Sequence, residues 1–375
     1  MHLLATSIVN IRLPAIHALP PYTICKMAAR EEHFLSILTE SNFHKAVSVS
    51  YISHMLWAQW HTIPLPAPDF FAGQTVIVTG ANIGLGLEAV RNFTRLGAAR
   101  VVVACRNIEK SERAIKDVQA SLPEAKTVFV PMDVDLGSFA SVAAFAKRCA
   151  LELDRVDAVV ENAGLATGIY TTLEGHESTI TVNVLSTFYM ALLLLPLLRR
   201  TAVQHNVRPR LAIVSSEAHL LARFREQHAP NMFAAMQPPE SMSHDRYNVS
   251  KLLELLLVRE LATVLTDHSI PVTLNTLNPG MCRTQLFRGL PFGVRHIVNG
   301  VLHIIGRSSD MGSRTLVAAA AAGPETHGQY MDTAQVWKVS DFVSSKEGAA
   351  VQKRLLAELL EIFEGVEPGI SKNLE

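Results

Sequence analysis

The sequence predicts an α/β fold, namely a single Rossmann-like, doubly wound parallel sheet with helices on both faces. Short apolar runs alternate along the chain with segments of helical length, as they do in βαβ proteins. The runs are apolar at nearly every position, which indicates strands buried on both faces. A glycine-rich turn joins the first run to the first helix. With 375 residues, 49% of them hydrophobic, the chain is long enough to bury such a core.

Each expected element follows from its pattern of apolar residues and turn signals. Gly97 stands at a favourable helix C-terminal position, and Ser138 is a suitable N-cap. The expected strands are residues 75–79, 100–104, 127–131, 157–160, 211–215 and 272–277. The expected helices are residues 87–96, 108–121, 138–153, 177–198 and 247–265. Ligands of parallel sheets bind beyond the carboxyl ends of the strands. Chemistry is therefore expected just after each strand, at Gly80, Arg106, Asp133, Asn162, Ser216 and Pro279.

The first strand and helix enclose the turn Gly80-Ala-Asn-Ile-Gly84-Leu-Gly86. Glycines at a strand-to-helix turn let the backbone approach a pyrophosphate, and the helix N-terminus presents free N–H groups to it. The spacing is G-x-x-x-G-x-G rather than G-x-G-x-x-G. Glycines also occur at such turns for packing alone, so the pattern favours a nucleotide site without proving one.

Composition excludes several other classes of function. Lys plus Arg and Asp plus Glu number 34 each, so there is no net charge and no nucleic-acid footprint. The four cysteines show no metal or disulfide spacing, and we expect no metal site at His219, His228 or His244. We also predict no membrane span. The longest candidate, residues 190–198, has about half the ~20 residues required, and Pro196 interrupts it.

The chain divides into an N-terminal extension, residues 1–69, and one domain over residues 70–375. Short helices are expected at residues 31–38 and 47–60. One interpretation is a poorly ordered extension, with Met27 as the better start. The other is an apolar stripe that touches a membrane surface or covers the domain. That stripe consists of Ile52, Met55, Leu56, Trp57 and Trp60.

The segment Tyr247-Asn-Val-Ser-Lys251 opens a predicted helix. Residues four apart share a helix face, so the phenol and the ammonium point the same way. A nearby positive charge stabilises a phenolate and lowers the tyrosine pKa, which suits the phenol to proton transfer. Alone, the Tyr-x-x-x-Lys spacing is common on exposed helix faces.

In this context the chain resembles the short-chain dehydrogenases/reductases over about residues 70–285. The retinol-dehydrogenase-like and fungal branches are the most similar, because the interval from Ser216 to Tyr247 is long. The segments 312–315 and 323–325 also resemble fungal members, many of which serve secondary metabolism. The resemblance rests on seven motifs in order: Thr79-Gly80-x-x-x-Gly84-x-Gly86, Asp133-Val134, Asn162-Ala163-Gly164, Asn183, Ser215-Ser216, Tyr247-x-x-x-Lys251 and Pro279-Gly280.

The resemblance implies four catalytic residues. Tyr247 would exchange a proton with the substrate oxygen, and Lys251 would lower its pKa and bind the nicotinamide ribose. Ser216 would hold the substrate oxygen, with Ser215 as the alternative. Asn183 would kink its helix and hold a water in a proton relay, although it is also readable as an ordinary polar helix residue.

The resemblance also implies the cofactor site. Asp133 would contact the adenine, and the loop around Pro279 and Thr284 would border the carboxamide. The second strand ends in Ala104-Cys105-Arg106-Asn107, with an arginine and no acid, which favours NADP over NAD. The expected cofactor-binding residues are Gly80, Gly84, Leu85, Gly86, Arg106, Asp133, Asn162, Ala163, Gly164, Tyr247, Lys251, Pro279 and Thr284.

Two positions depart from the family pattern. Glu161 replaces the usual asparagine before Asn162-Ala163-Gly164, and Cys282 replaces the usual valine after Pro-Gly-x. The apolar segment 285–305 is expected to form a C-terminal helical lid, which favours a lipophilic substrate. The alternative is that these apolar residues pack on the sheet and form no lid.

The resemblance therefore implies an NADP-dependent enzyme that interconverts a carbonyl and an alcohol, in a fungal secondary-metabolite pathway or as a retinol- or steroid-type dehydrogenase. The expected location is the cytoplasm, with peripheral membrane contact and a homodimer by analogy. Two alternatives are a non-catalytic nucleotide-binding interaction protein and a membrane-peripheral binding protein.

Overall fold

The computed structural model describes residues 49–243, 245–284, 300, 302, 303 and 305–375. The chain divides into two compact units, Met1–Ser53 and His54–Glu375. The helix expected at residues 31–38 and most of the expected lid lie outside the described residues.

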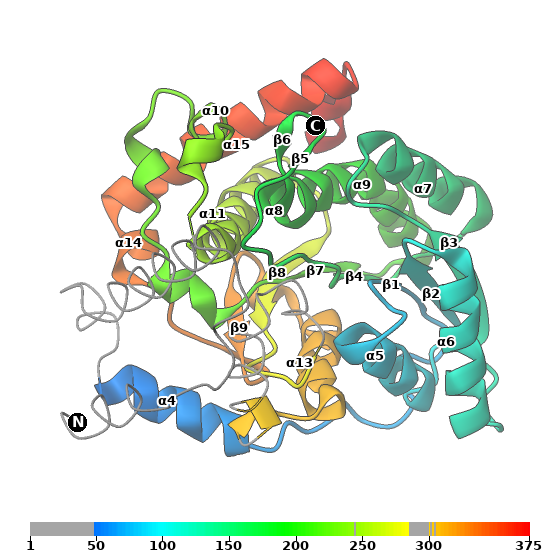
Figure 1. The fold of residues 1–375 in the computed structure, drawn as a ribbon. Helices are drawn as coiled ribbons and strands as arrows, with labels where there is room; N and C mark the ends of the chain where they lie inside the picture. Colours follow the sequence, from blue (N-terminus) through cyan, green and yellow to red (C-terminus); the bar gives the residue numbers. More distant parts are fainter. Residues whose placement is uncertain (1–48, 244, 285–299, 301, 304) are drawn as a thin grey trace, which may run out of the picture. The chain divides into compact units, whose positions relative to one another are not determined.

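Residues 54–375 form a mixed, mostly parallel sheet covered by helices on both faces, which confirms the predicted fold class (Figure 1). Its order is β10-β9-β8-β7-β4-β1-β2-β3, and β10 is the antiparallel strand at one edge. The strands are β1 (Thr75–Thr79), β2 (Arg100–Cys105), β3 (Val128–Asp133), β4 (Ala158–Glu161), β7 (Arg210–Val214), β8 (Thr273–Asn278), β9 (Tyr330–Asp332) and β10 (Gln335–Val336). A separate hairpin consists of β5 (Thr172–Leu173) and β6 (His176–Glu177).

The helices differ in length, and several connections are single turns. The α-helices are α4 (Val49–Trp60), α5 (Gly84–Arg95), α6 (Ile108–Ser121), α7 (Phe139–Glu152), α8 (Ser178–Ile180), α9 (Ser186–His205), α10 (Met232–Ala235), α11 (Arg246–Asp267), α13 (Ser309–Ala321), α14 (Asp341–Ser344) and α15 (Lys346–Val366). The other turns are the π-helix η1 (Thr181–Leu185) and the 3₁₀ turns η2 (Glu217–Leu221), η3 (Arg225–His228), η4 (Pro239–Ser241), η6 (Pro324–Thr326) and η7 (Ile370–Leu374).

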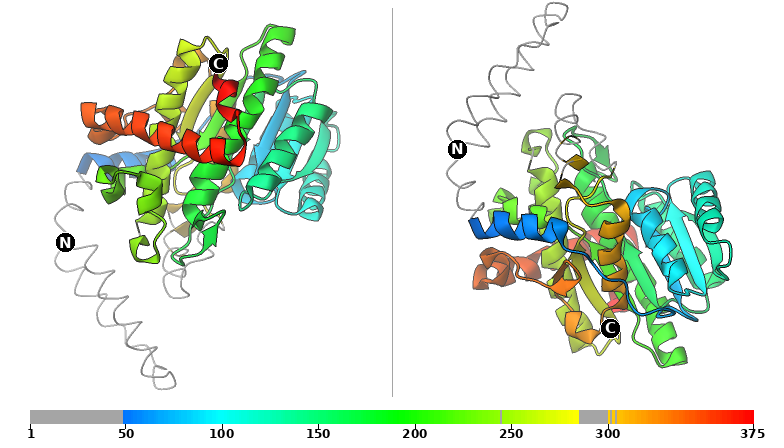
Figure 2. Two further views of the ribbon diagram at one scale, coloured as in Figure 1. Left: turned by 90° about the horizontal axis from the view of Figure 1, so that it is seen from above. Right: turned by 90° about the horizontal axis from the view of Figure 1, so that it is seen from below.

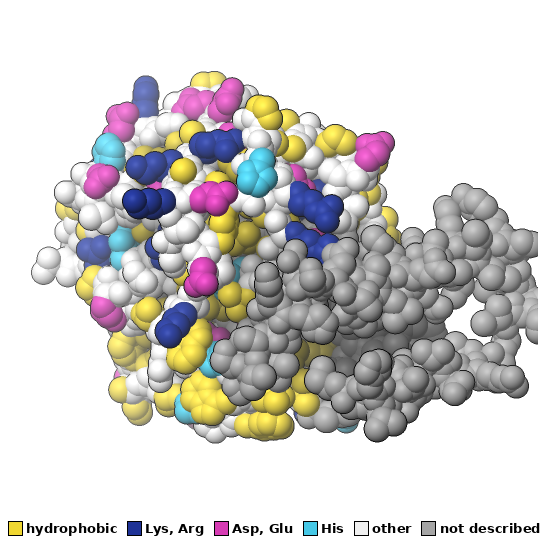
Figure 3. All heavy atoms as spheres, turned by 90° about the vertical axis from the view of Figure 1, so that its left-hand side faces the viewer, with side chains coloured by type: hydrophobic (Ala, Val, Ile, Leu, Met, Phe, Trp, Pro, Cys, Tyr) yellow, Lys and Arg dark blue, Asp and Glu magenta, His cyan; other side chains and the backbone are white. Residues whose placement is uncertain are grey.

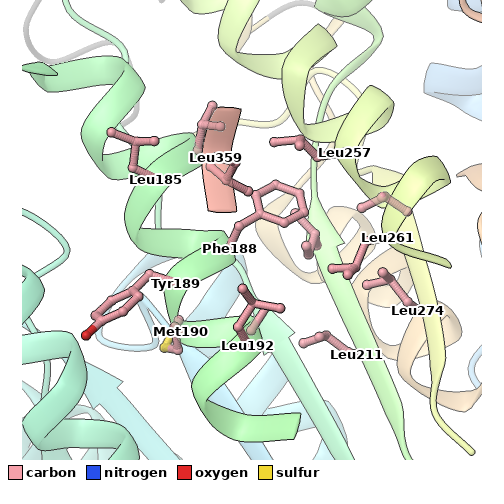
Figure 4. Packing of buried hydrophobic residues seen from close by; sticks show 14 of the residues in the cluster. Leu185, Phe188, Tyr189, Met190, Leu192, Leu211, Leu257, Leu261, Leu274 and Leu359 are labelled. Atoms are coloured by element: carbon pink, nitrogen blue, oxygen red, sulfur yellow. The ribbon is translucent and has the colours of Figure 1, made fainter. Parts of the chain in front are cut away.

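The alternation of side chains along β1 explains why the sheet has two cores. Ile77 belongs to the core under α7, α9, α11 and α15, whereas Val76 and Val78 belong to the core under α5, α6 and α13. Figure 4 shows the first core, in which Phe188 of α9, Leu257 of α11 and Leu359 of α15 meet. Burial on both faces is what the continuous apolar strands predicted.

The order in which the parallel strands are added reverses in the middle of the sheet. From β1 the chain proceeds to β2 and β3 on one side, and then returns to β4, β7 and β8 on the other. The crevice beyond the carboxyl ends of β1 and β4 is therefore the topological switch point, where sheets of this type bind ligands.

Several predicted boundaries are wrong by a few residues. Helix α5 begins at Gly84 rather than at residue 87, because Gly84, Leu85 and Gly86 already form its first turn. The expected helix 177–198 is interrupted by η1 and continues to His205. Strands β9 and β10 and the β5–β6 hairpin were not expected, because runs of two or three residues carry no periodicity.

The prediction that no stretch could span a membrane needs correction. The helical segment Ser178–His205 is long and apolar enough by length and composition, and Pro196 lies within α9 on its exposed side. However, 83% of its most apolar window is buried inside the fold. It is therefore the core helix that the sequence analysis proposed.

The C-terminal helix α15 lies across the layer formed by α9 and α11 (Figure 2), and η7 packs against α9. A homodimer paired through α9 and α11 would require α15 to move. The homodimer stays a prediction.

The described part of α4 does not bury its expected apolar stripe. Ala58 and Gln59 are buried, whereas Trp57 and Trp60 are 45% and 70% exposed. Hydrophobic side chains gather along the lower edge of the face in Figure 3, where α4 lies. His54 stacks on the ring of Trp337, with centroids 4.1 Å apart. Peripheral membrane contact stays a prediction.

Candidate active site

The glycine turn after β1 is built for close approach. Gly80 and Gly84 have positive φ angles of 63° and 58°, which residues other than glycine seldom adopt. A Cβ on Gly86 would lie 2.4 Å from the Gly80 carbonyl oxygen and 2.7 Å from Asn162 Nδ2. The turn therefore leaves no room for a side chain at Gly86.

The segment after β4 is locked to this turn by hydrogen bonds. The Thr79 hydroxyl accepts from the backbone N–H groups of Asn162 and Ala163, at 3.0 and 3.1 Å. Asn162 Nδ2 donates to the Thr79 carbonyl oxygen at 2.9 Å. The expected adenosine-side residues are thus held to the glycine turn by hydrogen bonds. The side-chain N–H of Asn162 is used in a bond to the protein backbone.

The loop after β8 reaches the same place. The methyl carbon of Thr284 lies 3.8 Å from where a Cβ on Gly84 would be, so Thr284 faces the glycine turn. Arg307 is buried and donates to the carbonyl oxygens of Pro279, at 3.2 Å, and Ala58. This arginine ties the loop to α4, a contact that the sequence gave no reason to expect.

Three of the four expected catalytic residues meet at the carboxyl ends of β4 and β7. The Ser216 side chain lies close enough to the phenol of Tyr247 to lower its pKa, and Lys251 Nζ lies 5.7 Å from the centroid of the phenol ring. Burial raises the pKa of Tyr247, and the Lys251 charge and the Ser216 side chain only partly offset this rise. Ser215 is separate, because its hydroxyl donates to the Lys251 carbonyl oxygen at 2.9 Å. The expected alternative, Ser215, is therefore a structural residue here.

Asn183 lies in the π-turn η1 and is fully buried. Its Nδ2 donates to the Leu165 carbonyl oxygen at 2.9 Å and to Ser250 Oγ at 3.0 Å, and its Oδ1 accepts from Leu165 N at 2.7 Å. The expected kink is present as the π-turn, a feature common at functional sites. The side chain joins the segment after Gly164 to α11 and so helps to position the site. All of its described hydrogen bonds are to protein groups.

The remaining expected cofactor residues lie at the edges of this crevice. Arg106 is exposed after β2, and Asp133 forms an ion pair with Arg148 at 3.7 Å. The Leu85 side chain points toward Gly312, which leaves its backbone to face a ligand. A hollow of about 360 Å³ lies beside the glycine turn. It is lined by Asn82, Ile83, Leu87, Lys110, Arg113, Ala114 and Asp117.

The short turn that follows Ser216 holds two titratable groups, the half-buried Glu217 and the buried His219. Burial raises the pKa of Glu217 to about 7, and the nearby Asp332 adds to the rise. Burial lowers the pKa of His219 to about 4, although its Nδ1 lies 2.8 Å from the Ser216 carbonyl oxygen. Within the described residues no group of three or more His, Cys, Asp or Glu side chains could hold a metal.

Two buried carboxyl groups, Glu254 beside Lys251 and Glu161 at the end of β4, were not expected as site residues. Lys251 Nζ donates to Glu254 Oε1 at 2.8 Å and to the Val214 carbonyl oxygen at 2.9 Å. Burial raises the pKa of Glu254 to about 7, and that of Glu161 well above its usual range. An acid inside the apolar run Leu-Leu-Glu-Leu-Leu-Leu was the signal that could have identified Glu254.

Sequence comparison identifies relatives that match this chain over most of their own length. Residues 74–223 match the short chain dehydrogenase family. The chain is 37% identical to the short chain dehydrogenase/reductase dmxR8 of Cryptosporiopsis sp. over 317 residues, 83% of this chain and 97% of the relative. It is 41% identical to the short chain dehydrogenase atnD of Emericella nidulans over 287 residues, 75% of this chain and 90% of the relative.

Solved structures agree in fold. An uncharacterised protein from Mycobacterium paratuberculosis superposes with a TM-score of 0.57 and 25% identity, covering 80% of this chain and 96% of that one. A 3-oxoacyl (acyl-carrier-protein) reductase from Agrobacterium tumefaciens, solved with NADP bound, superposes with a TM-score of 0.51 and 19% sequence identity. The match covers 70% of this chain and 93% of the reductase. On the identity and coverage of its sequence relatives, this chain belongs to the short-chain dehydrogenase/reductase family of oxidoreductases.

Proposed function

We propose that this protein is an NADP-dependent oxidoreductase that interconverts a carbonyl with a primary or secondary alcohol on a lipophilic substrate. The observation that carries the proposal is that the Ser216 hydroxyl and the Lys251 ammonium both lie beside the phenol of Tyr247. A proton donor and a second hydroxyl that converge on one point suit a substrate oxygen.

The residues at the glycine turn fit a dinucleotide. The positive φ angles of Gly80 and Gly84 bring backbone N–H groups to the N-terminus of α5, where an anionic pyrophosphate is stabilised. The Thr284 side chain lies across this turn from the other side. When bound, the nicotinamide supplies or accepts the hydride.

The protein's own contribution is a proton at a fixed position. In the reducing direction, Ser216 donates a hydrogen bond to the substrate carbonyl oxygen, and Tyr247 Oη gives that oxygen its proton. In the oxidising direction, the phenolate takes the alcohol proton. Lys251 stabilises the phenolate in both directions because its ammonium charge is held beside the ring.

The preference for NADP rests on charge near the ribose. Arg106 follows β2 with no acid from Ala104 to Asn107, and a planar guanidinium suits a 2′-phosphate. Two further basic side chains, Lys110 and Arg113, line the hollow beside the glycine turn. Their positive charge supports the proposed preference for a cofactor with an added phosphate.

The lipophilic substrate rests on the apolar composition of residues 285–305, most of which lie outside the described residues. The fungal origin of the relatives supports a role in secondary metabolism, on a polyketide or terpenoid. A retinoid or steroid is the alternative substrate. We place the protein in the cytoplasm.

The test is NADPH oxidation by the full chain with a panel of lipophilic ketones and aldehydes that includes retinoids and steroids. Tyr247→Phe is expected to lower kcat at least about 100-fold while NADPH still binds, because only the proton donor is removed. The matched control is Tyr189→Phe in the first turn of α9, which removes a buried hydroxyl that donates to Glu367 at 2.7 Å. Turnover that survives in Tyr247→Phe would contradict the assigned acid/base role.

A further inference from the structure

The loop that follows β8, residues 279–284, is the part of the site that is expected to border the nicotinamide. At its C-terminal end, Thr284 faces the glycine turn. Toward its N-terminal end, two side chains from distant parts of the chain hold its backbone. They are Gln59 of α4 and Arg307, and both are buried, at 7% and 4% exposure.

The amide of Gln59 pairs with the backbone of Met281. In the amide orientation that satisfies both groups, it donates to the Met281 carbonyl oxygen and accepts from the Met281 N–H, each at 3.0 Å. A side-chain amide that meets a peptide group in this way supplies the partner that a neighbouring strand would otherwise provide. An aliphatic residue at position 59 would leave the Met281 N–H without this partner.

Arg307 binds the same loop from a different segment of the chain. Its backbone N–H donates to the Met281 carbonyl oxygen at 2.8 Å, and its carbonyl oxygen accepts from the Arg283 N–H at 3.0 Å. Its guanidinium donates to the carbonyl oxygens of Pro279, at 3.2 Å, and of Ala58 in α4. One buried side chain therefore joins the loop directly to α4.

Gly280 shows how closely the two side chains approach the loop. Its φ angle is +76°, and a Cβ at this position would lie 2.8 Å from Arg307 Nη1 and 3.3 Å from the amide of Gln59. Both groups thus lie against the same backbone position. The loop is held there by contacts that need a residue without a side chain.

A chain of polar contacts leads from the arginine back to α4. Arg307 Nη2 donates to Thr333 Oγ1 at 3.4 Å, and the Thr333 hydroxyl donates to Asp332 Oδ1 at 3.0 Å. The other oxygen of Asp332 lies 3.1 Å from Nε2 of His54, the first residue of α4 within this compact unit. Helix α4 is therefore bound to the loop both directly and through the end of β9.

We infer that Gln59 and Arg307 are positioning residues that fix the backbone of residues 279–283 in the shape that receives the nicotinamide half of the cofactor, which makes α4 part of the cofactor site. The inference rests on the proposed function, in which this loop borders the carboxamide. A loop that is ordered before the cofactor binds loses little conformational entropy on binding, and the affinity is higher for it.

The first test measures amide hydrogen exchange in the cofactor-free full chain. Gln59→Leu replaces the amide with an alkyl group of about the same size and removes both bonds to Met281. Peptides that contain residues 280–283 are expected to exchange at least about tenfold faster, because the Met281 N–H loses its partner. Peptides that contain residues 80–86 should exchange at the wild-type rate. Unchanged exchange at residues 280–283 would overturn the inference.

The second test separates the two halves of the cofactor. NADPH carries the nicotinamide, whereas 2′,5′-ADP carries only the adenosine and its phosphates. In titration calorimetry, Gln59→Leu should raise the Kd of NADPH at least about tenfold and change the Kd of 2′,5′-ADP by less than about twofold. Equal weakening of both ligands would mean that Gln59 only stabilises the fold, and would refute the assigned role.

A wild-type protein that binds neither ligand would count against the proposed function. The exchange measurement needs no ligand and would still show whether α4 holds the loop. The two failures are therefore distinguishable.

Arg307→Lys is the second variant, and it tests the inference if Gln59→Leu does not fold. It keeps the positive charge beside Thr333, but a single ammonium group cannot reproduce the planar fork that reaches Pro279 and Ala58 together. NADPH binding should again weaken more than 2′,5′-ADP binding. A wild-type ratio of the two Kd values in this variant would remove Arg307 from the positioning role.

The matched control is Gln352→Leu in α15. Gln352 is 6% exposed, and its Nε2 donates to the Val343 carbonyl oxygen at 2.9 Å, so the same substitution again removes a buried amide from a backbone partner. The urea unfolding midpoint should fall, while the exchange at residues 280–283 and the ratio of the two Kd values stay at their wild-type values. If this control changes them as Gln59→Leu does, general destabilisation explains the effect and the inference fails.

Discussion

Gly86→Ala is the substitution whose cost follows most directly from the structure. The added Cβ would lie 2.4 Å from the Gly80 carbonyl oxygen, 2.7 Å from Asn162 Nδ2 and 2.9 Å from Ala81 Cα. Two of these atoms belong to the backbone, so the turn itself must move. Overpacking of this kind costs about 1–3 kcal/mol. A displaced Asn162 would weaken its bond to Thr79, worth about 1 kcal/mol more.

The expected loss is therefore about 2–4 kcal/mol of the free energy of unfolding, with NADPH affinity reduced at least about tenfold. The first is measured by urea unfolding and the second by NADPH fluorescence titration. Gly365→Ala is the matched control, because no atom lies within 4 Å of its Cβ position on α15. There alanine should stabilise the helix by about 0.5–1 kcal/mol. If Gly86→Ala keeps both the wild-type unfolding midpoint and the wild-type affinity, the close-approach argument fails.

Two further predictions concern cofactor choice and acid stability. Arg106→Asp should shift the ratio of kcat/KM for NADPH and NADH toward NADH by about tenfold or more, and an unchanged ratio in steady-state assays would remove Arg106 from the 2′-phosphate site. The pKa of His219 is lowered to about 4, so its contribution to stability is present above about pH 6.5 and lost as the pH falls through 4. This loss amounts to about 3 kcal/mol. Urea unfolding at about pH 7.5 and 4 should show the wild-type advantage over His219→Gln shrinking on acidification, and a constant difference would contradict the buried neutral imidazole.

Some features of this protein follow from local sequence patterns, and others depend on contacts between distant segments. The run Thr75–Thr79, the glycines after it and the Tyr247-x-x-x-Lys251 spacing are local patterns, and they were enough to predict the fold class. The place of the site that they indicate stays a prediction. They act over one strand or one helical turn, where backbone geometry alone decides which side chains share a face.

Other features depended on segments far apart in the chain. The burial of Glu161 beside Glu254, the π-turn at Thr181–Leu185 and the cover of α11 by α15 arise only when distant elements pack. The same holds for the adjacent residues Ser215 and Ser216. Ser216 lies beside the Tyr247 phenol, whereas the Ser215 hydroxyl donates to the backbone of α11.

The amino-acid sequence by itself thus determined that this chain folds as a doubly wound sheet and which residues of a known catalytic pattern it carries. Only the tertiary structure decided the electrostatic surroundings of Tyr247. Charge interactions depend on distance and on the exclusion of water, and both are properties of the packed core rather than of any segment within it.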